Sequence, residues 1–217
     1  MREFSPSLLW VPAVAYLLGS IPFGLILTKL FGGGDVRKAG SGNVGATNVT
    51  RVAGPVAGIL TLVLDAAKGS VAVWLAARFS GETAGWMIVA GLAALIGHCF
   101  PLWLKFRGGK GVATAAGMFL MLSPLALLGS VLLFLTVVIV SRYVSLGSIA
   151  AAAAMPLLVY FLWAPHHAPP LIVTSGAFVA AMLIVYKHDA NIQRLVEGRE
   201  SRFSFGKNKG SKSKGTE

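Results

Sequence analysis

Long apolar runs separated by short charged segments dominate this sequence. About 20 apolar residues in helical form cross the roughly 30 Å hydrocarbon core of a bilayer. Because 55% of the 217 residues are hydrophobic and only 12% are charged, disorder is excluded and a water-soluble domain is disfavoured. The pattern predicts an all-α, polytopic transmembrane bundle. The apolar runs cover residues 7–30, 55–79, 84–104, 112–141, 147–163 and 171–186.

The run at residues 112–141 decides how many times the chain crosses the membrane. It is too long for one untilted helix and short for two, and Ser123-Pro124 interrupts it near the middle. A helical hairpin would return Arg142 to the side of Lys105 and Lys110, in line with the excess of Lys and Arg on cytoplasmic loops. We therefore predict seven transmembrane helices, with the N-terminus outside and the C-terminus in the cytoplasm.

The chain is predicted to hold one membrane domain, residues 1–205, followed by a disordered tail, residues 206–217. The tail mixes Lys, Gly and Ser without apolar periodicity, and its charge would attract it weakly to anionic lipid. The formal charge of +11 therefore reflects membrane topology, and no nucleic-acid partner is expected. Cys99 is the single cysteine, which excludes an internal disulfide.

Polar, glycine-rich sequence falls on three segments of the predicted cytoplasmic face, and the first is residues 31–54. It contains a run dense in Gly, Ser, Asn and Thr at residues 40–48, followed by Arg51. Glycines let backbone amides approach an anion closely, the short polar side chains add hydrogen-bond donors, and Arg51 adds a charged fork. These residues indicate a cradle for a phosphate or a carboxylate. A flexible loop of ordinary turn residues explains the same run at least as well when it is considered alone.

The second segment, residues 105–111, directly precedes the helix expected from Val112. Backbone amides at a helix N-terminus carry partial positive charge, and here the three cations Lys105, Arg107 and Lys110 and three glycines surround them. We predict a second anion site at this loop. A basic cluster that merely fixes topology explains the cations and leaves the glycines without a reason. The spacing does not fit a Walker A loop.

The third segment follows the last span, at residues 187–200. If it is helical, His188 and Asn191 share one face with Arg194 or Leu195. A histidine beside an amide donor can orient a hydroxyl group or accept its proton. A solvated histidine in a juxtamembrane helix is the more common outcome for such a residue.

Other polar residues are less specific. Asp65 and Lys68 lie three apart within an apolar run, where we expect them to pair or to line a wet cavity. His98 lies near the end of its run and is expected to hydrogen-bond the loop at 105–111. No metal site is expected there, nor at His166 and His167, because partner ligands are missing from the sequence around them.

Considered together, the three segments resemble one family, the bacterial acyl-phosphate:glycerol-3-phosphate acyltransferases of the cytoplasmic membrane. The resemblance rests on residues 41–51, on residues 97–101 with 108–114, and on residues 187–195 with Gly198 and Glu200. Arg107 stands where the family usually has lysine, and Lys187 where arginine is common, so the roles of these two positions are less certain.

The resemblance implies that a fatty acyl group passes from acyl-phosphate to the 1-hydroxyl of glycerol 3-phosphate, which gives lysophosphatidic acid and phosphate. Acyl-phosphate is a mixed anhydride with a good leaving group, so no covalent acyl-enzyme is needed. The implied partners are these two substrates, the bilayer and the soluble enzyme that makes acyl-phosphate; no cofactor or metal is expected. The active site would face the cytoplasm at the inner membrane of a bacterium.

The predicted site residues fall into two groups. The predicted catalytic residues are Ser41, Arg51, Lys110, His188 and Asn191. The predicted substrate-binding residues are Gly42, Asn43, Gly45, Thr47, Asn48, Lys105, Arg107, Gly108, Gly109, Gly111, Arg194 and Glu200.

Two other functional classes stay open on the residues alone. A transporter for a phosphorylated metabolite would also use anion cradles and an intramembrane ion pair, although the polar motifs gather on one face and no internal repeat is visible. A non-enzymatic scaffold would leave the glycine-rich loops without a purpose.

Overall fold

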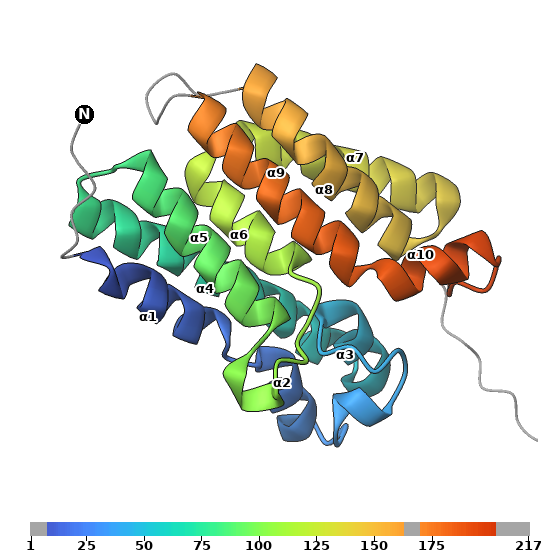
Figure 1. The fold of residues 1–217 in the computed structure, drawn as a ribbon. Helices are drawn as coiled ribbons and strands as arrows, with labels where there is room; N and C mark the ends of the chain where they lie inside the picture. Colours follow the sequence, from blue (N-terminus) through green and yellow to red (C-terminus); the bar gives the residue numbers. More distant parts are fainter. Residues whose placement is uncertain (1–7, 163–169, 203–217) are drawn as a thin grey trace, which may run out of the picture.

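The computed structural model describes residues 8–162 and 170–202, and this part of the chain is entirely helical (Figure 1). The predicted all-α architecture is therefore confirmed. In chain order the elements are α1 (Trp10–Gly19), α2 (Phe23–Leu30), η2 (Val36–Lys38), α3 (Ala46–Ala53), α4 (Pro55–Ser80), α5 (Ala84–Cys99), η3 (Leu102–Leu104), α6 (Val112–Leu122), α7 (Pro124–Ser141), α8 (Val144–Phe161), α9 (Pro170–Lys187) and α10 (Asp189–Val196).

Five segments of the described chain are long and apolar enough to cross a membrane. They are Trp10–Leu30, Pro55–Ser80, Ala84–Leu104, Pro124–Ser141 and Val144–Phe161. A sixth results if Leu171–Lys187 and Asp189–Val196, which meet at a 58° bend, form one broken span. Helix α6 has 11 residues and is therefore about 17 Å long, roughly half the thickness of the hydrocarbon core.

Prolines explain where the helices break. Pro124 begins α7 directly after Ser123, which confirms the interruption predicted within residues 112–141. The apolar run at residues 7–30 corresponds to the candidate span Trp10–Leu30, but its helix is interrupted between Gly19 and Phe23. Pro22 has no N–H to continue the ladder and disfavours helical geometry at the residue before it, so α2 starts as a separate helix.

Small residues let the helices pack closely. Gly117 of α6 lies against the Ala66 carbonyl of α4, and Gly19 of α1 lies against the Ala94 carbonyl of α5, each at a distance that leaves no room for a Cβ atom. Between helices in lipid, where hydrophobic burial gives little preference, such contacts supply much of the attraction. The result is a rigid bundle whose helix ends are fixed relative to one another.

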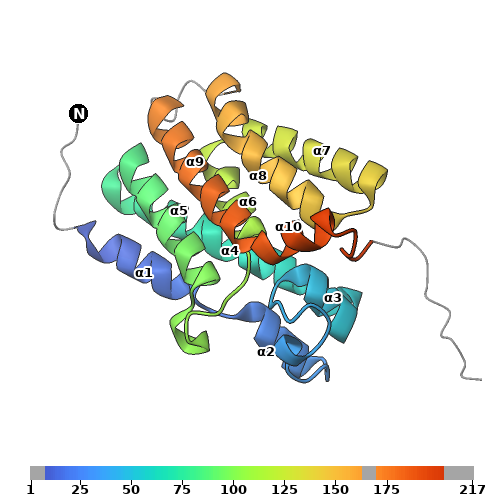
Figure 2. The same cartoon turned by 45° about the vertical axis from the view of Figure 1, so that its right-hand side comes forward.

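The polar segments collect at one end of this bundle. The short helices α2, α3 and α10 lie there together in two views that differ by 45° (Figures 1 and 2). The start of α6 and the loop before it reach the same end. Segments that are separated by 50 residues or more in the sequence are therefore neighbours in space.

Candidate active site

A cavity of about 660 Å³ opens at the end of the bundle where these segments meet. Its wall is formed by the loop before α3, by α3 itself, by the start of α6, by α8 and by the region around α10. Every predicted catalytic residue lines it: Ser41, Arg51, Lys110, His188 and Asn191. Of the predicted substrate-binding residues, Asn43, Gly45, Thr47, Asn48, Gly111, Arg194 and Glu200 line it, whereas Gly42, Lys105, Arg107, Gly108 and Gly109 do not.

Asn48 organises the first loop. Its side chain is buried, and its Nδ2 donates hydrogen bonds to the carbonyls of Val36 (3.2 Å), Ala39 (3.0 Å) and Asn43 (2.9 Å). Its Oδ1 accepts the backbone N–H of Ser41 at 2.9 Å. The Asn48 amide therefore shapes the loop, and its contact with substrate stays a prediction.

This folded loop presents polar groups to the cavity. After the loop the chain forms α3, a helix that was not predicted from the sequence. Arg51 lies in the last turn of α3, and its side chain is exposed at the cavity wall. Ser41 and Thr47 are exposed at the cavity wall. Gly42 has a φ of +70° and its N–H is bonded to the Ala39 carbonyl, so it serves the turn rather than a ligand.

The loop before α6 differs from the predicted anion cradle. Its Gly108 N–H donates to the Cys99 carbonyl (3.1 Å) and its Gly109 N–H donates to the His98 carbonyl (3.0 Å), as expected for a contact between His98 and this loop. In this structure both amides are bonded to the end of α5, and an anion-binding role for the two glycines stays a prediction. Lys105 and Arg107 are exposed outside the cavity lining, and their contact with substrate stays a prediction.

Lys110 is the cation that this loop delivers to the cavity. Its ammonium donates a hydrogen bond to Asn191 Oδ1, which joins the second and third polar segments. The pKa of Lys110 is lowered to about 8, mainly by burial; Glu200 opposes this shift, and the charges of Arg194 and Arg51 add to it. An ammonium with a lowered pKa gains more from an arriving anion than a fully hydrated one does.

His188 follows α9 at the bend before α10 and is buried. Its Nδ1 lies 2.7 Å from the Ile184 carbonyl oxygen, a geometry in which Nδ1 carries the hydrogen and donates it. This tautomer leaves Nε2 as a hydrogen-bond acceptor. Burial is the main cause that lowers the pKa of His188 to about 4, so the ring is neutral at physiological pH.

Glu200 holds the third segment together. Its Oε1 accepts hydrogen bonds from Ser145 (2.7 Å) and from Asn191 Nδ2 (2.6 Å), and its Oε2 accepts one from Arg194 Nε (2.7 Å). Burial would raise the pKa of Glu200, but these hydrogen bonds outweigh it and keep the pKa below its ordinary value. Both oxygens of Glu200 are thus engaged within the protein, and its contact with substrate stays a prediction.

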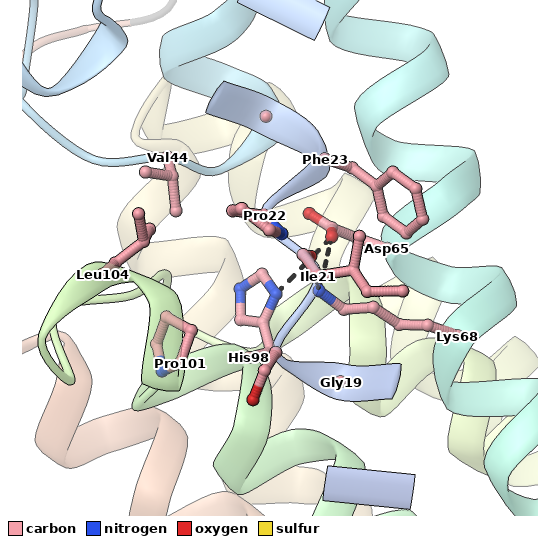
Figure 3. Close-up of a pocket in the computed structure, with 12 residues that line it drawn as sticks. Gly19, Ile21, Pro22, Phe23, Val44, Asp65, Lys68, His98, Pro101 and Leu104 are labelled. Carbon is pink, nitrogen blue, oxygen red and sulfur yellow. Dashed lines mark hydrogen bonds and ion pairs between the residues drawn. The ribbon is translucent and has the colours of Figure 1, made fainter. Parts of the chain in front are cut away.

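A buried ionic cluster adjoins the cavity (Figure 3). Asp65 and Lys68 of α4 form the pair that the sequence predicts, at 2.8 Å between Oδ1 and Nζ. The Lys68 ammonium also donates to the Ile21 carbonyl (3.1 Å) at the break between α1 and α2. His98 of α5 turns its Nδ1 toward the same carboxylate oxygen at 3.6 Å. Asp65 and His98 also line the large cavity.

Part of the cavity wall was not predicted. Leu62, Val112 and Phe134 give it an apolar side formed by α4, α6 and α7, and Ser145 and Ser148 of α8 add hydroxyls. The serines carry a weak signal in the sequence, because they lie three apart on one face of an otherwise apolar helix. The apolar residues carry no such signal in the sequence, since lipid-facing and cavity-facing side chains of a membrane helix have the same composition.

Known proteins with similar sequences share one description. The family described as glycerol-3-phosphate acyltransferase matches residues 9–198. A protein named glycerol-3-phosphate acyltransferase from Syntrophotalea carbinolica is 51% identical over 87% of this chain and 94% of its own length. Its namesake from Trichlorobacter lovleyi is 52% identical over 90% of this chain and 97% of its own length.

Two solved structures share the fold. Both are crystal structures of PlsY (YgiH), an integral membrane glycerol 3-phosphate acyltransferase, one in the glycerol 3-phosphate form and one in the lysophosphatidic acid form. The first matches with a TM-score of 0.83 at 44% identity, over 91% of this chain and 96% of that chain. The second matches with a TM-score of 0.81 at 43% identity, with the same coverage.

Proposed function

This chain belongs to the glycerol-3-phosphate acyltransferase family, and from that premise we propose that it transfers a fatty acyl group from acyl-phosphate to the 1-hydroxyl of glycerol 3-phosphate. The products are lysophosphatidic acid and phosphate. In the transfer, the glycerol oxygen forms a bond to the acyl carbon as the bond from that carbon to the phosphate oxygen breaks.

One observation carries the proposal: three polar segments far apart in the sequence meet at one cavity. Arg51, Lys110 and Arg194 bring positive charge to it, and an apolar side accompanies them. A donor with a phosphate head and a fatty chain needs both kinds of surface, and an acceptor with a second phosphate needs more than one cation.

Acyl-phosphate binds with its head between the first loop and Lys110. Ser41, Thr47 and Arg51 donate to the phosphate oxygens from one side, and the Lys110 ammonium does so from the other. The acyl chain extends past Phe134 and Leu62 toward lipid. Donors aimed at the departing phosphate and at the developing oxyanion supply the largest part of the rate enhancement.

Glycerol 3-phosphate enters from the cytoplasm, and His188 and Asn191 orient its hydroxyl. A neutral imidazole with a pKa of about 4 accepts a hydrogen bond well but is a weak base. As the bond from the acyl carbon to the phosphate oxygen breaks, its electron pair stays on the phosphate, so an oxygen of the departing phosphate becomes the stronger base. We therefore assign proton removal to the donor phosphate and positioning to His188.

The membrane arrangement in this proposal has seven helices crossing or entering the bilayer, with the N-terminus outside and the C-terminus in the cytoplasm. The cavity then opens on the cytoplasmic side of the inner membrane of a bacterium, where a soluble enzyme that makes acyl-phosphate can reach it. Residues 1–205 form the catalytic domain. The tail at 206–217 lies outside the described residues.

The direct test is a reaction with purified protein in detergent. Palmitoyl-phosphate and glycerol 3-phosphate are expected to give phosphate and lysophosphatidic acid in equal amounts, whereas palmitoyl-CoA and palmitoyl-acyl carrier protein give none. Arg51→Ala and Lys110→Ala are each expected to cut turnover at least ~100-fold. The matched control is Lys105→Ala, which removes an exposed cation outside the cavity and keeps the rate. Near-normal turnover in both cavity variants would contradict the assignment.

A further inference from the structure

His98 connects the buried ionic cluster to the loop that carries Lys110. On one side its Nδ1 faces the Asp65 carboxylate, and on the other its ring lies against Gly109 (Figure 3 shows the Asp65 side). A Cβ atom at position 109 would overlap the ring at Nε2. The His98 carbonyl also accepts the Gly109 N–H at 3.0 Å. Both the ring and the backbone of His98 therefore contact the residue that precedes Lys110.

The need for glycine at position 109 comes from this ring. Gly109 does not have the positive φ that excludes other residues, unlike Gly111, whose φ is +85°. The three nearest atoms to an added Cβ at position 109 are all in the His98 imidazole. An alanine there would be acceptable to the backbone and is excluded by one neighbouring side chain.

Asp65 holds the imidazole from behind. Because the carboxylate pairs with Lys68 on the same helix, and Lys68 is bonded to the Ile21 carbonyl, the carboxylate is held by α4 and by the break between α1 and α2. The imidazole is thus confined between an anchored carboxylate and the loop. A rigid support of this kind sets where the next side chain points.

We propose that His98 is a positioning residue: its imidazole, confined by Asp65, fixes Gly109 and so places the Lys110 ammonium at the cavity. The inference rests on the proposed function of Lys110 and adds a residue that supports it from outside the three polar segments. The buried pair of Asp65 and Lys68 then contributes to catalysis indirectly, because it holds the His98 imidazole in place.

His98→Ala tests the inference without stranding a charge. Asp65 keeps its ion pair with Lys68 after the imidazole is removed, so the fold is expected to survive. A displacement of about 1 Å at a reacting group costs up to ~100-fold in rate. We expect His98→Ala to lower kcat/KM for glycerol 3-phosphate by ~10- to 100-fold.

The first experiment tests whether the loss of kcat/KM in His98→Ala depends on Lys110. In a Lys110→Ala background, His98→Ala is expected to change the residual kcat/KM by less than ~2-fold, the range in which independent effects cannot be told apart. The same loss in both backgrounds would show that His98 acts independently of Lys110 and would overturn the inference. If Lys110→Ala alone keeps normal activity, the proposed function of the cavity fails instead, so the two failures are distinguishable.

The second experiment uses the contact with Gly109. Gly109→Ala alone is expected to lower kcat/KM about as much as His98→Ala, because the methyl group displaces the loop. In the His98→Ala background, the methyl occupies the vacated space, and Gly109→Ala is expected to cost nothing further. Multiplying losses would contradict the proposed contact.

Val73→Ala separates positioning from general loss of stability. Val73 is a fully buried residue of α4 away from the cavity lining, and its truncation lowers the melting temperature. It is expected to leave kcat/KM within ~2-fold of the parent at a temperature where the protein is folded. If Val73→Ala reduces kcat/KM as much as His98→Ala at an equal drop in melting temperature, His98 has only a structural role.

Discussion

The lowered pKa of Lys110 predicts how activity depends on pH. Burial and the nearby arginines bring this pKa down from 10.5 to about 8, so the free enzyme has a charged Lys110 at pH 7 and a neutral one at pH 9. Phosphate monoesters have their second pKa near 6 and stay dianionic throughout this range. A change in substrate binding between pH 7 and 9.5 therefore reports on the protein.

The size of the effect follows from the structure. A fall of the pKa from 10.5 to about 8 means that the ammonium is less favourable than in water by about 3 kcal/mol. The attraction between this ammonium and a dianionic phosphate at roughly 4 Å is about 4 kcal/mol per unit charge at an effective dielectric constant of 20. The attraction exceeds the cost, so Lys110 stays charged in the enzyme–substrate complex well above pH 8.

The two kinetic parameters should therefore separate. The ratio kcat/KM reports the free enzyme and is expected to fall about tenfold per pH unit above pH 8, whereas kcat reports the complex and stays level to about pH 9. Initial rates are measured between pH 6.5 and 9.5 in detergent, with acyl-phosphate varied at a subsaturating concentration of glycerol 3-phosphate, so that kcat/KM reports a cavity without a bound anion. A blank corrects for spontaneous hydrolysis of acyl-phosphate. In Lys110→Arg, the guanidinium does not titrate, so the fall above pH 8 is expected to disappear even if the absolute rate is lower.

Two results would refute this reasoning. One is a kcat/KM that stays level to pH 9.5 in the parent enzyme. The other is a fall near pH 8 that persists in Lys110→Arg. The same shift also fixes a sign for stability: between pH 8 and 10.5 the unfolded chain binds more protons at Lys110, so this residue makes the folded state relatively more stable as the pH rises.

Three further predictions concern single residues. His188→Ala is expected to raise KM for glycerol 3-phosphate and to lower kcat by less than the ~10²-fold typical of a lost general base, as steady-state kinetics would show; a larger fall in kcat would restore the base role. Glu200→Gln should lower the melting temperature in detergent, because the charge-assisted bond from Arg194 weakens, and its stabilising effect should also fade as the pH falls below the ordinary range of a glutamate; an unchanged melting curve argues against it. Gly117→Ala should destabilise the bundle by forcing α6 from α4, whereas Gly85→Ala, with no described atom within 4 Å of the added methyl, should stabilise α5 by up to about 1 kcal/mol; equal melting temperatures would contradict the packing argument.

Much of the architecture could be predicted from local sequence. The apolar runs identify the long helices, because a segment that crosses a bilayer must be helical to satisfy its backbone hydrogen bonds and must be apolar over its length. The break at Pro124 follows from the missing N–H of proline. The gathering of Ser41, Lys110 and His188 at one cavity follows once charge places their segments on the same face.

The free or bound state of each glycine amide could not be predicted. Gly108 and Gly109 have the composition of an anion-binding loop, but their N–H groups bond the last carbonyls of α5. This pairing depends on the chain folding back over η3, from Cys99 to Gly108, which the spacing of the residues does not reveal. The hydrogen bonds by which Asn48 shapes its loop could not be predicted either, since an asparagine that shapes a loop and one that binds a ligand have the same sequence context.

Arg51 and Lys110 have different roles at the cavity because their cationic groups differ in exposure and chemistry. Arg51 presents a guanidinium at the exposed cavity wall, where it attracts both phosphorylated substrates. Lys110 is less exposed and is bonded to Asn191; its lowered pKa means that an arriving anion strengthens the hold on its proton. An interaction that strengthens as negative charge builds on the departing phosphate lowers the barrier, whereas one that is equally strong before and after only tightens binding. Lysine at position 110 is therefore suited to the chemical step, and arginine at position 51 to capture.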